Sequence, residues 1–158
     1  MEEEVKRHPL TLRKPERLRH RTLVNELFEH GSSLYAFPLR MQWLFVPASR
    51  MKSAFRDGRP DGIDPLQRMI VIPKRKMRHA VDRVLLRRRV REAYRLNRLP
   101  LLHLACEKSR GGVLLLSFIY ISDKICEYGK VERAVRRLLD GVGAELAKIH
   151  DDEINEGE

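Results

Sequence analysis

The chain has 158 residues, 42% of them hydrophobic, which is enough for one small domain with a real core. Its 32 lysines and arginines against 22 acids give a formal net charge of +10. No apolar run approaches the roughly 20 residues that span a bilayer, and residues 1–19 lack the apolar segment of a signal peptide. We therefore expect a cytoplasmic protein with no membrane contact, one domain and a polyanionic partner.

Metal and nucleophile motifs are missing from the sequence. Cys106 and Cys126 are far apart and form no CxxC pair, so neither a zinc site nor a disulfide framework is expected. The six histidines make no HxH or HExxH pattern, and the acids make no paired motif. We predict no catalytic and no metal-ligating residue. A stand-alone nuclease or metalloenzyme is the disfavoured alternative.

The first half of the chain predicts an arm, a helix and a strand. Residues 1–14 are charged, contain one proline and read as a basic N-terminal arm; the predicted domain spans residues 15–149. Apolar residues at steps of three and four from Glu16 predict a helix that stops near Gly31. Residues 37–47 predict a strand with Leu39, Met41, Trp43 and Phe45 on one face and Arg40, Gln42, Leu44 and Val46 on the other. Residues 48–67 predict a long, turn-rich loop.

The second half predicts a strand at 68–73, a basic loop, a helix at 80–98, a central strand at 113–121 and a helix at 128–149. Residues 101–110 predict a loop with a helical turn, and residues 150–158 an acidic tail. The predicted fold class is α+β, a small sheet packed with helices in the order α-β-β-α-β-α, with a possible extra short strand. The strand after the basic helix can pair parallel to the strand before it.

Positive charge is concentrated in one segment. Residues 68–98 hold twelve lysines and arginines against two acids, whereas the rest of the chain holds twenty of each. At 100° per residue, one arc of the helix at 80–98 collects Arg83, Arg87, Arg88, Arg91, Arg95 and Arg98, and the opposite arc collects Leu85, Leu86, Val90, Ala93 and Leu96. The apolar arc is expected to pack on the sheet, with Arg89 alone on that side.

Such a row of like charges indicates an anionic ligand. Like charges four residues apart each destabilise a helix by about 0.2–0.5 kcal/mol, and a merely solvated face would mix signs. Guanidinium groups suit phosphates, which accept paired hydrogen bonds. We predict RNA binding by Arg83, Arg87, Arg88, Arg91 and Arg95, extended by the loop residues Lys74, Arg75, Lys76 and Arg78. A folded RNA is favoured over a DNA groove because the helix lacks the Asn, Gln and Ser side chains that usually read base edges.

These residues resemble the bacterial ribonuclease P protein family. Its helix motif is A-V-x-R-N-x-x-K-R-x-x-R-E-x-[FY], and residues 80–94 here read A-V-D-R-V-L-L-R-R-R-V-R-E-A-Y. The preceding RMIVIPKRKMRHAV is similar to the family's strand and basic loop, and ERLRHRTLVNELFEHGSS to its first helix, so the resemblance covers about residues 12–148. Val84 stands where the family has asparagine, which puts one RNA or metal-associated contact in doubt. The loop at 48–67 is larger than usual for the family.

The resemblance implies a fold like the second domain of a small-subunit ribosomal protein, with a left-handed β-α-β crossover where the general rule would predict a right-handed one. It also implies a division of labour. The ribonuclease P RNA, with Mg²⁺ bound mainly by that RNA, removes the 5′ leader of precursor tRNA, while the protein binds this RNA and the leader and is inactive alone. We expect the chain to be monomeric without RNA.

The implied leader cleft lies between the first helix and the sheet, and the residues agree with it. Phe28 ends the first helix, and Arg40 and Gln42 occupy the polar face of the strand; an aromatic beside a basic strand face is how unpaired bases are held. Phe28 as a simple core residue is an equally open reading, whereas Trp43 is expected in the core. The alternative function is a ribosome-associated or other structured-RNA-binding protein without a catalytic partner.

Overall fold

Four strands form one mixed sheet at the centre of the molecule. In the computed structural model, which describes residues 10–12, 14–54 and 63–149, the strand order is β1 (Ser32–Ala36), β2 (Leu39–Val46), β4 (Val113–Tyr120), β3 (Leu66–Val71). The β1–β2 and β2–β4 pairs are antiparallel, and β3 pairs parallel with β4. All eight residues of β4 are buried, as the apolar run of this segment predicts for a central strand.

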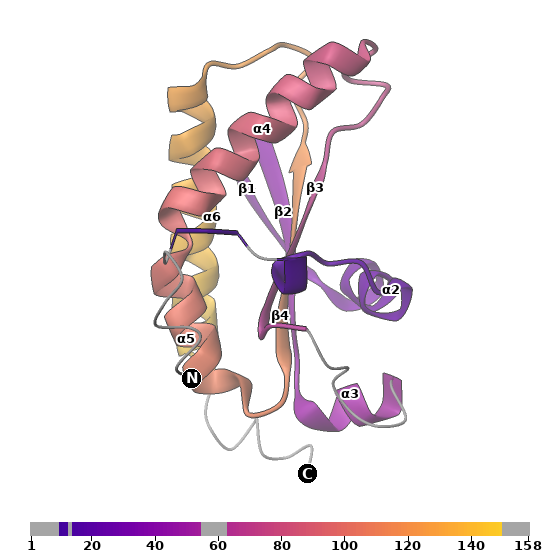
Figure 1. Cartoon of the computed structure of the whole chain (residues 1–158), viewed down its shortest axis with the longest axis vertical. Coiled ribbons are helices and arrows are strands. Elements are labelled where there is room, and N and C mark those ends of the chain that lie inside the picture. Colours follow the sequence, from indigo (N-terminus) through magenta and orange to yellow (C-terminus); the bar gives the residue numbers. More distant parts are fainter. Residues whose placement is uncertain (1–9, 13, 55–62, 150–158) are drawn as a thin grey trace.

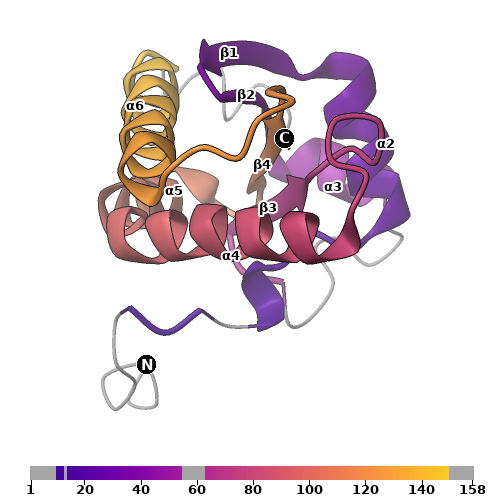
Figure 2. The ribbon, with the colours of Figure 1, turned by 90° about the horizontal axis from the view of Figure 1, so that it is seen from above.

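Helices cover both faces of this sheet, as Figures 1 and 2 show. On one face lie α4 (Ala80–Asn97), α5 (Leu99–Ser109) and α6 (Tyr128–Ala147); on the other lie α2 (Arg21–His30) and α3 (Ala48–Ala54). The alternation of β2 divides its side chains as predicted. Leu39, Met41, Trp43 and Phe45 join the larger core under α4 to α6, while Leu44 and Val46 join the smaller core under α2 and α3.

The α+β prediction is confirmed, including the extra short strand, which is β1. The crossover between the parallel strands runs from β3 through α4 and α5 to β4. Seen from the side of α5 and α6 with both strands pointing upward, β4 lies to the left of β3 (Figures 1 and 2). The crossover is therefore left-handed, against the general rule and in agreement with the family resemblance.

Three boundaries were predicted wrongly. The first helix begins at Arg21 rather than Glu16, since Lys14–Glu16 forms a separate 3-10 turn, η1. Residues 101–109 belong to the helix α5 and Arg110 caps its end; Pro100 stands in the first turn of α5, where a missing N–H costs nothing. The long loop at 48–67 contains α3, and Met51 and Ile63 anchor its two ends in the smaller core. Residues 55–62 of that loop lie outside the described residues, as do residues 150–158.

The inner side of α4 packs on the larger core less completely than the helical wheel predicts. Leu86, Val90, Ala93 and Tyr94 are fully buried, and Tyr94 meets Phe118 of β4 edge to face. Leu85 and Leu96, which the wheel places on the core side, are instead exposed. The helix lies near the sheet edge and against α6, so only a narrow stripe of it faces apolar neighbours.

The N-terminal segment runs along the free edge of β3. Arg17 and Arg68 form a parallel bridge, and the Leu18 N–H donates to the Arg68 carbonyl at 2.8 Å. Glu16 belongs to this segment, and its carboxylate accepts two hydrogen bonds from Arg98. The distances are 2.8 Å from Nε to Oε1 and 3.3 Å from Nη2 to Oε2. Both side chains of the pair are at most 2% exposed. The segment is therefore attached to the C-terminal end of α4.

Glu16→Gln should lower the free energy of unfolding by about 3–5 kcal/mol, because the substitution leaves Arg98 charged, buried and unpaired. Chemical denaturation of the full chain measures this loss. Glu92→Gln is the control, since the Glu92–Arg95 pair is solvent-exposed and should cost less than about 1 kcal/mol. Equal losses in the two variants would contradict the role assigned to the buried pair.

Candidate nucleic-acid interface

Three arginines of α4 form an exposed ridge. Arg87, Arg88 and Arg91 are exposed, and none of them makes a hydrogen bond or ion pair with the described part of the chain. Arg91 lies one turn beyond the adjacent Arg87 and Arg88, on a helix whose other side is held by the core. No carboxylate of the described residues pairs with these three guanidinium groups, as expected of a surface that binds an external anion. The ridge keeps its full hydrogen-bonding capacity for an external acceptor.

The basic loop before α4 is tied to the helix by Arg83. Its Nη1 donates to the carbonyl oxygens of Met77 at 2.9 Å and Arg78 at 2.8 Å. Arg83 therefore holds the loop in place, with only part of its guanidinium free. The loop's own cations remain exposed around it: Lys74, Arg75, Lys76 and Arg78. Met77, between them, is buried and anchors the loop in the larger core.

The remaining arginines of α4 have partners within the protein. Arg95 makes a two-point contact with Glu92, 2.9 Å from Nε and 2.7 Å from Nη2, and this contact lowers the pKa of Glu92. Arg89, predicted on the apolar side, donates to the Cys126 carbonyl at 2.6 Å. Arg98, predicted in the basic arc, is instead buried against Glu16. A helical wheel could not predict that Arg98 is buried, because its partner Glu16 lies 82 residues away in the sequence.

Arg68 was not predicted as a site residue, yet it lies where the ridge meets the N-terminal segment. It is 6% exposed, its Nε has no hydrogen-bond partner, and its guanidinium lies 5.6 Å from the centre of the Tyr94 ring. Burial lowers the pKa of Arg68, while Tyr94 and Glu16 act in the opposite direction. The signal was present in the sequence only as a charged residue at the start of an apolar strand.

Two adjoining hollows open over Arg68. Their volumes are about 270 and 340 Å³, and both are lined by Arg17, Arg68 and Arg91. Lys14 and Arg95 add charge to the first hollow and Arg87 to the second. Among the described residues, Glu92, already bound to Arg95, is the one acid that lines either hollow. We call this surface the Arg68 groove. A buried arginine beneath exposed ones is suited to an anion that accepts several charge-assisted hydrogen bonds.

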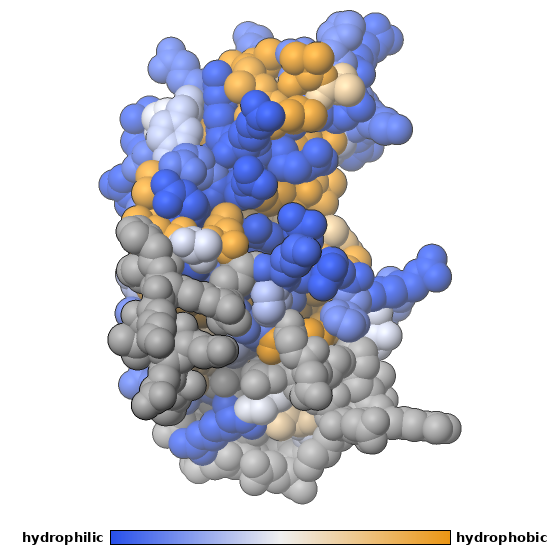
Figure 3. Space-filling model, in the orientation of Figure 1, coloured by the Kyte–Doolittle hydropathy of each residue, from blue (hydrophilic) through white to orange (hydrophobic). Residues whose placement is uncertain are grey.

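An apolar patch interrupts the basic surface at the N-terminal end of α4. Figure 3 shows it among hydrophilic side chains toward the upper end of the helix, and Val81, Val84 and Leu85 are the exposed apolar residues there. Val84 thus stands on the exposed side, as the wheel placed it. The basic loop and the ridge are therefore two cationic areas with an apolar area between them.

The predicted leader residues lie on the α2 face of the sheet. Phe28 is 43% exposed at the last turn of α2, so it is not a core residue. Arg40 and Gln42 are half-buried on β2, and their side chains alternate with Leu39 and Met41 of the opposite core. Gln42 pairs in register with Ser117 of β4, and neither Gln42 Oε1 nor Ser117 Oγ, both buried, has a hydrogen-bond partner.

Metal-ligand geometry is not found among the described residues, where no three His, Cys, Asp or Glu side chains converge. No helix in this part of the chain is long and apolar enough to cross a membrane. Cations are the main charged groups of the Arg68 groove and the ridge in the described part of the chain.

Comparison with known proteins agrees with the motif. The model of the ribonuclease P family matches residues 12–110. Ribonuclease P protein components from two strains of Porphyromonas gingivalis are each 30% identical over 130 residues, which cover 81% of this chain and 83% of each relative. The chain belongs to the ribonuclease P protein family, a family of tRNA-processing ribonucleoproteins, and the resemblance read from its helix motif is confirmed.

Millimolar sulfate should raise the unfolding midpoint of the protein more than sodium chloride of equal ionic strength. A divalent anion bound in the Arg68 groove stabilises the native state by an amount that rises with the logarithm of its concentration, to about 2.7 kcal/mol at a hundred times the dissociation constant. Thermal unfolding followed by circular dichroism measures the difference. Arg68→Met should lose most of it. The same gain in both proteins would mean that sulfate acts only as a general stabilising salt.

Proposed function

We propose that this chain is the protein subunit of a ribonuclease P ribonucleoprotein that binds the catalytic RNA through α4 and its basic loop. The observation that carries the proposal is the ridge of Arg87, Arg88 and Arg91, unpaired on a helix whose opposite side is fixed in the core. Its residues stand on the motif positions of the family that the chain belongs to. The Arg68 groove extends the same surface toward the N-terminal segment.

Electrostatics favours a structured polyanion at this surface. Neutralising six to eight phosphates releases condensed counterions, which makes association strong at low salt and steeply salt-dependent. The ridge is rigid because Leu86, Val90 and Ala93 are fully buried below it. A fixed helix backbone spaces the guanidinium groups, and each planar fork loses little freedom per hydrogen bond that it forms, so the row suits a folded RNA whose phosphates are already positioned.

The α2 face of the sheet is proposed to hold the unpaired 5′ leader of precursor tRNA. Phe28 offers an exposed ring for base stacking, and Arg40 offers a cation for the backbone. Gln42 Oε1 and Ser117 Oγ, adjacent across β2 and β4, are buried polar atoms without protein partners. Because both atoms are buried, the contacts proposed for the leader are those of Phe28 and Arg40.

Phosphodiester hydrolysis is assigned to the RNA subunit and its Mg²⁺ ions. The exposed basic surface of this chain carries the carboxylates Asp82 and Glu92, and Glu92 is held by Arg95. These residues do not fit a resident magnesium ion, which requires several oxygen ligands in octahedral geometry. The chain's own residues position RNA and leader, and the protein alone is expected to be inactive.

Reconstitution tests the proposal. Adding the chain to a catalytic ribonuclease P RNA at low magnesium should increase the rate of precursor-tRNA cleavage, since the protein supplies charge that the RNA otherwise obtains from metal ions. No increase, with binding to another structured RNA retained, would favour an RNA-binding protein without a catalytic partner. Cleavage by the RNA-free protein would contradict the assignment of catalysis to the RNA.

Arg87→Ala combined with Arg91→Ala should weaken binding to the RNA subunit and flatten the salt slope of log K by about one to two units. Filter binding across a salt series measures both. Arg50→Ala combined with Lys148→Ala removes the same charge from residues that pair with Glu26 and Glu145, and should leave the slope nearly unchanged. An unchanged slope in the ridge variant would refute the contact with phosphates.

Phe28→Ala should weaken the binding of precursor tRNA to the reconstituted enzyme while leaving mature tRNA unaffected. A lost stacking contact costs about 1–3 kcal/mol per base, or roughly five- to 150-fold in affinity. Equilibrium binding of the two tRNAs provides the comparison, with Phe28→Tyr expected to retain the preference. Equal losses for both tRNAs would place the leader elsewhere.

A further inference from the structure

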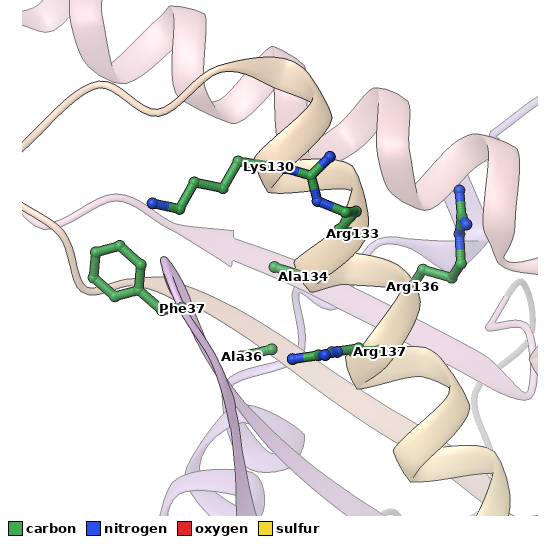
Figure 4. Close-up of a pocket in the computed structure, with 7 residues that line it drawn as sticks. All are labelled: Ala36, Phe37, Lys130, Arg133, Ala134, Arg136 and Arg137. Carbon is green, nitrogen blue, oxygen red and sulfur yellow. The ribbon is translucent and has the colours of Figure 1, made fainter.

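A hollow between α6 and the β1–β2 turn forms a second cationic surface, remote in sequence from α4. Its volume is about 400 Å³, and its wall on the sheet side is made by Ala36 and Phe37. The other wall, drawn with it in Figure 4, is the N-terminal half of α6, which supplies the cations Lys130, Arg133, Arg136 and Arg137. We call this the α6 hollow. No acid of the described residues lines it.

Three of the four cations that line the α6 hollow have no ionic partner in the described part of the chain. Lys130, Arg133 and Arg137 are exposed and make no hydrogen bond or ion pair there, whereas the fourth, Arg136, is held by Glu132 at 2.6 Å. Figure 4 shows Lys130 and Arg137 extending toward the hairpin and Arg136 extending away from it. Arg133 and Arg137, one turn apart, repel each other, and Lys130 lies in the first turn, where the helix dipole disfavours a cation.

An exposed aromatic ring lies at the mouth of the same hollow. Phe37 is 57% exposed in the turn between β1 and β2, and the Lys130 ammonium lies 4.8 Å from its ring centre. The flexible Lys130 side chain can move from the Phe37 ring to a phosphate, which leaves the face of the ring open to stack against a base. The hollow thus combines one stacking surface with three unpaired cations.

We propose that the α6 hollow binds an unpaired nucleotide of single-stranded RNA, with the base on Phe37 and the adjoining phosphates on Lys130, Arg133 and Arg137. A volume of about 400 Å³ is in the range of small-ligand sites and accommodates one nucleotide. An aromatic ring beside a cationic track is the arrangement by which proteins hold single strands. An acidic peptide would satisfy the charges but would leave the ring without a stacking partner.

The α6 hollow is separate from the two surfaces already proposed. It lies on the α6 side of the sheet, whereas Arg40 and Gln42 face the α2 side, and it shares no lining residue with the Arg68 groove. The identity of the polymer as RNA rests on the proposed function. The existence of a base-and-phosphate site rests on Phe37 and α6 alone.

The test is a titration of the isotope-labelled full chain with hexauridylate, followed by nuclear magnetic resonance. Signals of Phe37, Lys130, Arg133 and Arg137 should shift together and yield one dissociation constant. Phe37→Ala should weaken that constant at least about fivefold, the lower bound for a lost base stack, and Phe37→Trp should restore it. Arg133→Ala combined with Arg137→Ala should weaken it further and flatten its salt dependence.

Arg50→Ala combined with Lys148→Ala is the control for net charge and should change the constant less than twofold. The proposal would be overturned if this control lost as much affinity as the Arg133 and Arg137 double variant. It would also be overturned if Phe37→Ala bound hexauridylate as tightly as the unaltered chain. Titration with oligoglutamate distinguishes the occupants: tighter binding of this probe than of hexauridylate would identify an acidic peptide site instead.

The outcomes for the two proposals are separable. If the signals of the α6 hollow do not shift and the chain still stimulates the catalytic RNA, the nucleotide site in the hollow is refuted and the proposed function stands. If the signals of Phe37 and α6 shift but the chain gives no stimulation, the nucleotide site is supported and the proposed function is refuted.

Discussion

The buried ion pair between Glu16 and Arg98 is the contact on which the shape of the basic surface depends. It joins the N-terminal segment to the end of α4, while a hydrogen bond from Gln67 to the Pro15 carbonyl joins that segment to β3. Together with the Arg17–Arg68 bridge, it holds Arg17 where it lines the Arg68 groove with Arg91. The pair also neutralises Arg98, the more deeply buried of the two arginines that the fold encloses here, Arg68 and Arg98.

Much of the framework could be predicted from the sequence because it depends on local periodicity. The alternation along β2, the apolar run of β4 and the three- and four-residue steps of α4 and α6 each gave the right element. The errors occur where the hydrophobic period is weak, or where a residue in a core-like position of the helix has no neighbour to pack against. The apolar run at 99–105 has no clear period, so α5 was read as a loop. Leu85 and Leu96 have core-like positions, but α4 meets its neighbours along a narrower stripe than the wheel assumes.

The sequence predicted which residues supply the positive charge of the candidate site. It did not predict which of them are exposed and which bind other parts of the protein. Seven arginines between residues 83 and 98 look alike in sequence, yet Arg98 is buried, Arg83 and Arg89 bind backbone carbonyls, and Arg95 binds Glu92. These roles are set by Glu16, Met77 and Cys126, which are distant along the chain or lie in loops. Arg68 was missed for a related reason: strand alternation turns it toward the inner side of α4, and only the tertiary structure places Tyr94 beneath its guanidinium.

The division of roles explains how one helix can be both part of a core and the proposed polyanion-binding surface. Arg95 and Arg98 are neutralised by carboxylates, and Arg83 and Arg89 point hydrogen bonds at backbone carbonyls, so the charge without a partner lies on the ridge and on the loop at 74–78. The apolar residues Val81, Val84 and Leu85 lie between these two areas, where the family motif has an asparagine at the position of Val84. A phosphate gains little from an apolar neighbour. Contacts with the RNA backbone should therefore concentrate at the two ends of the surface rather than spread evenly along α4.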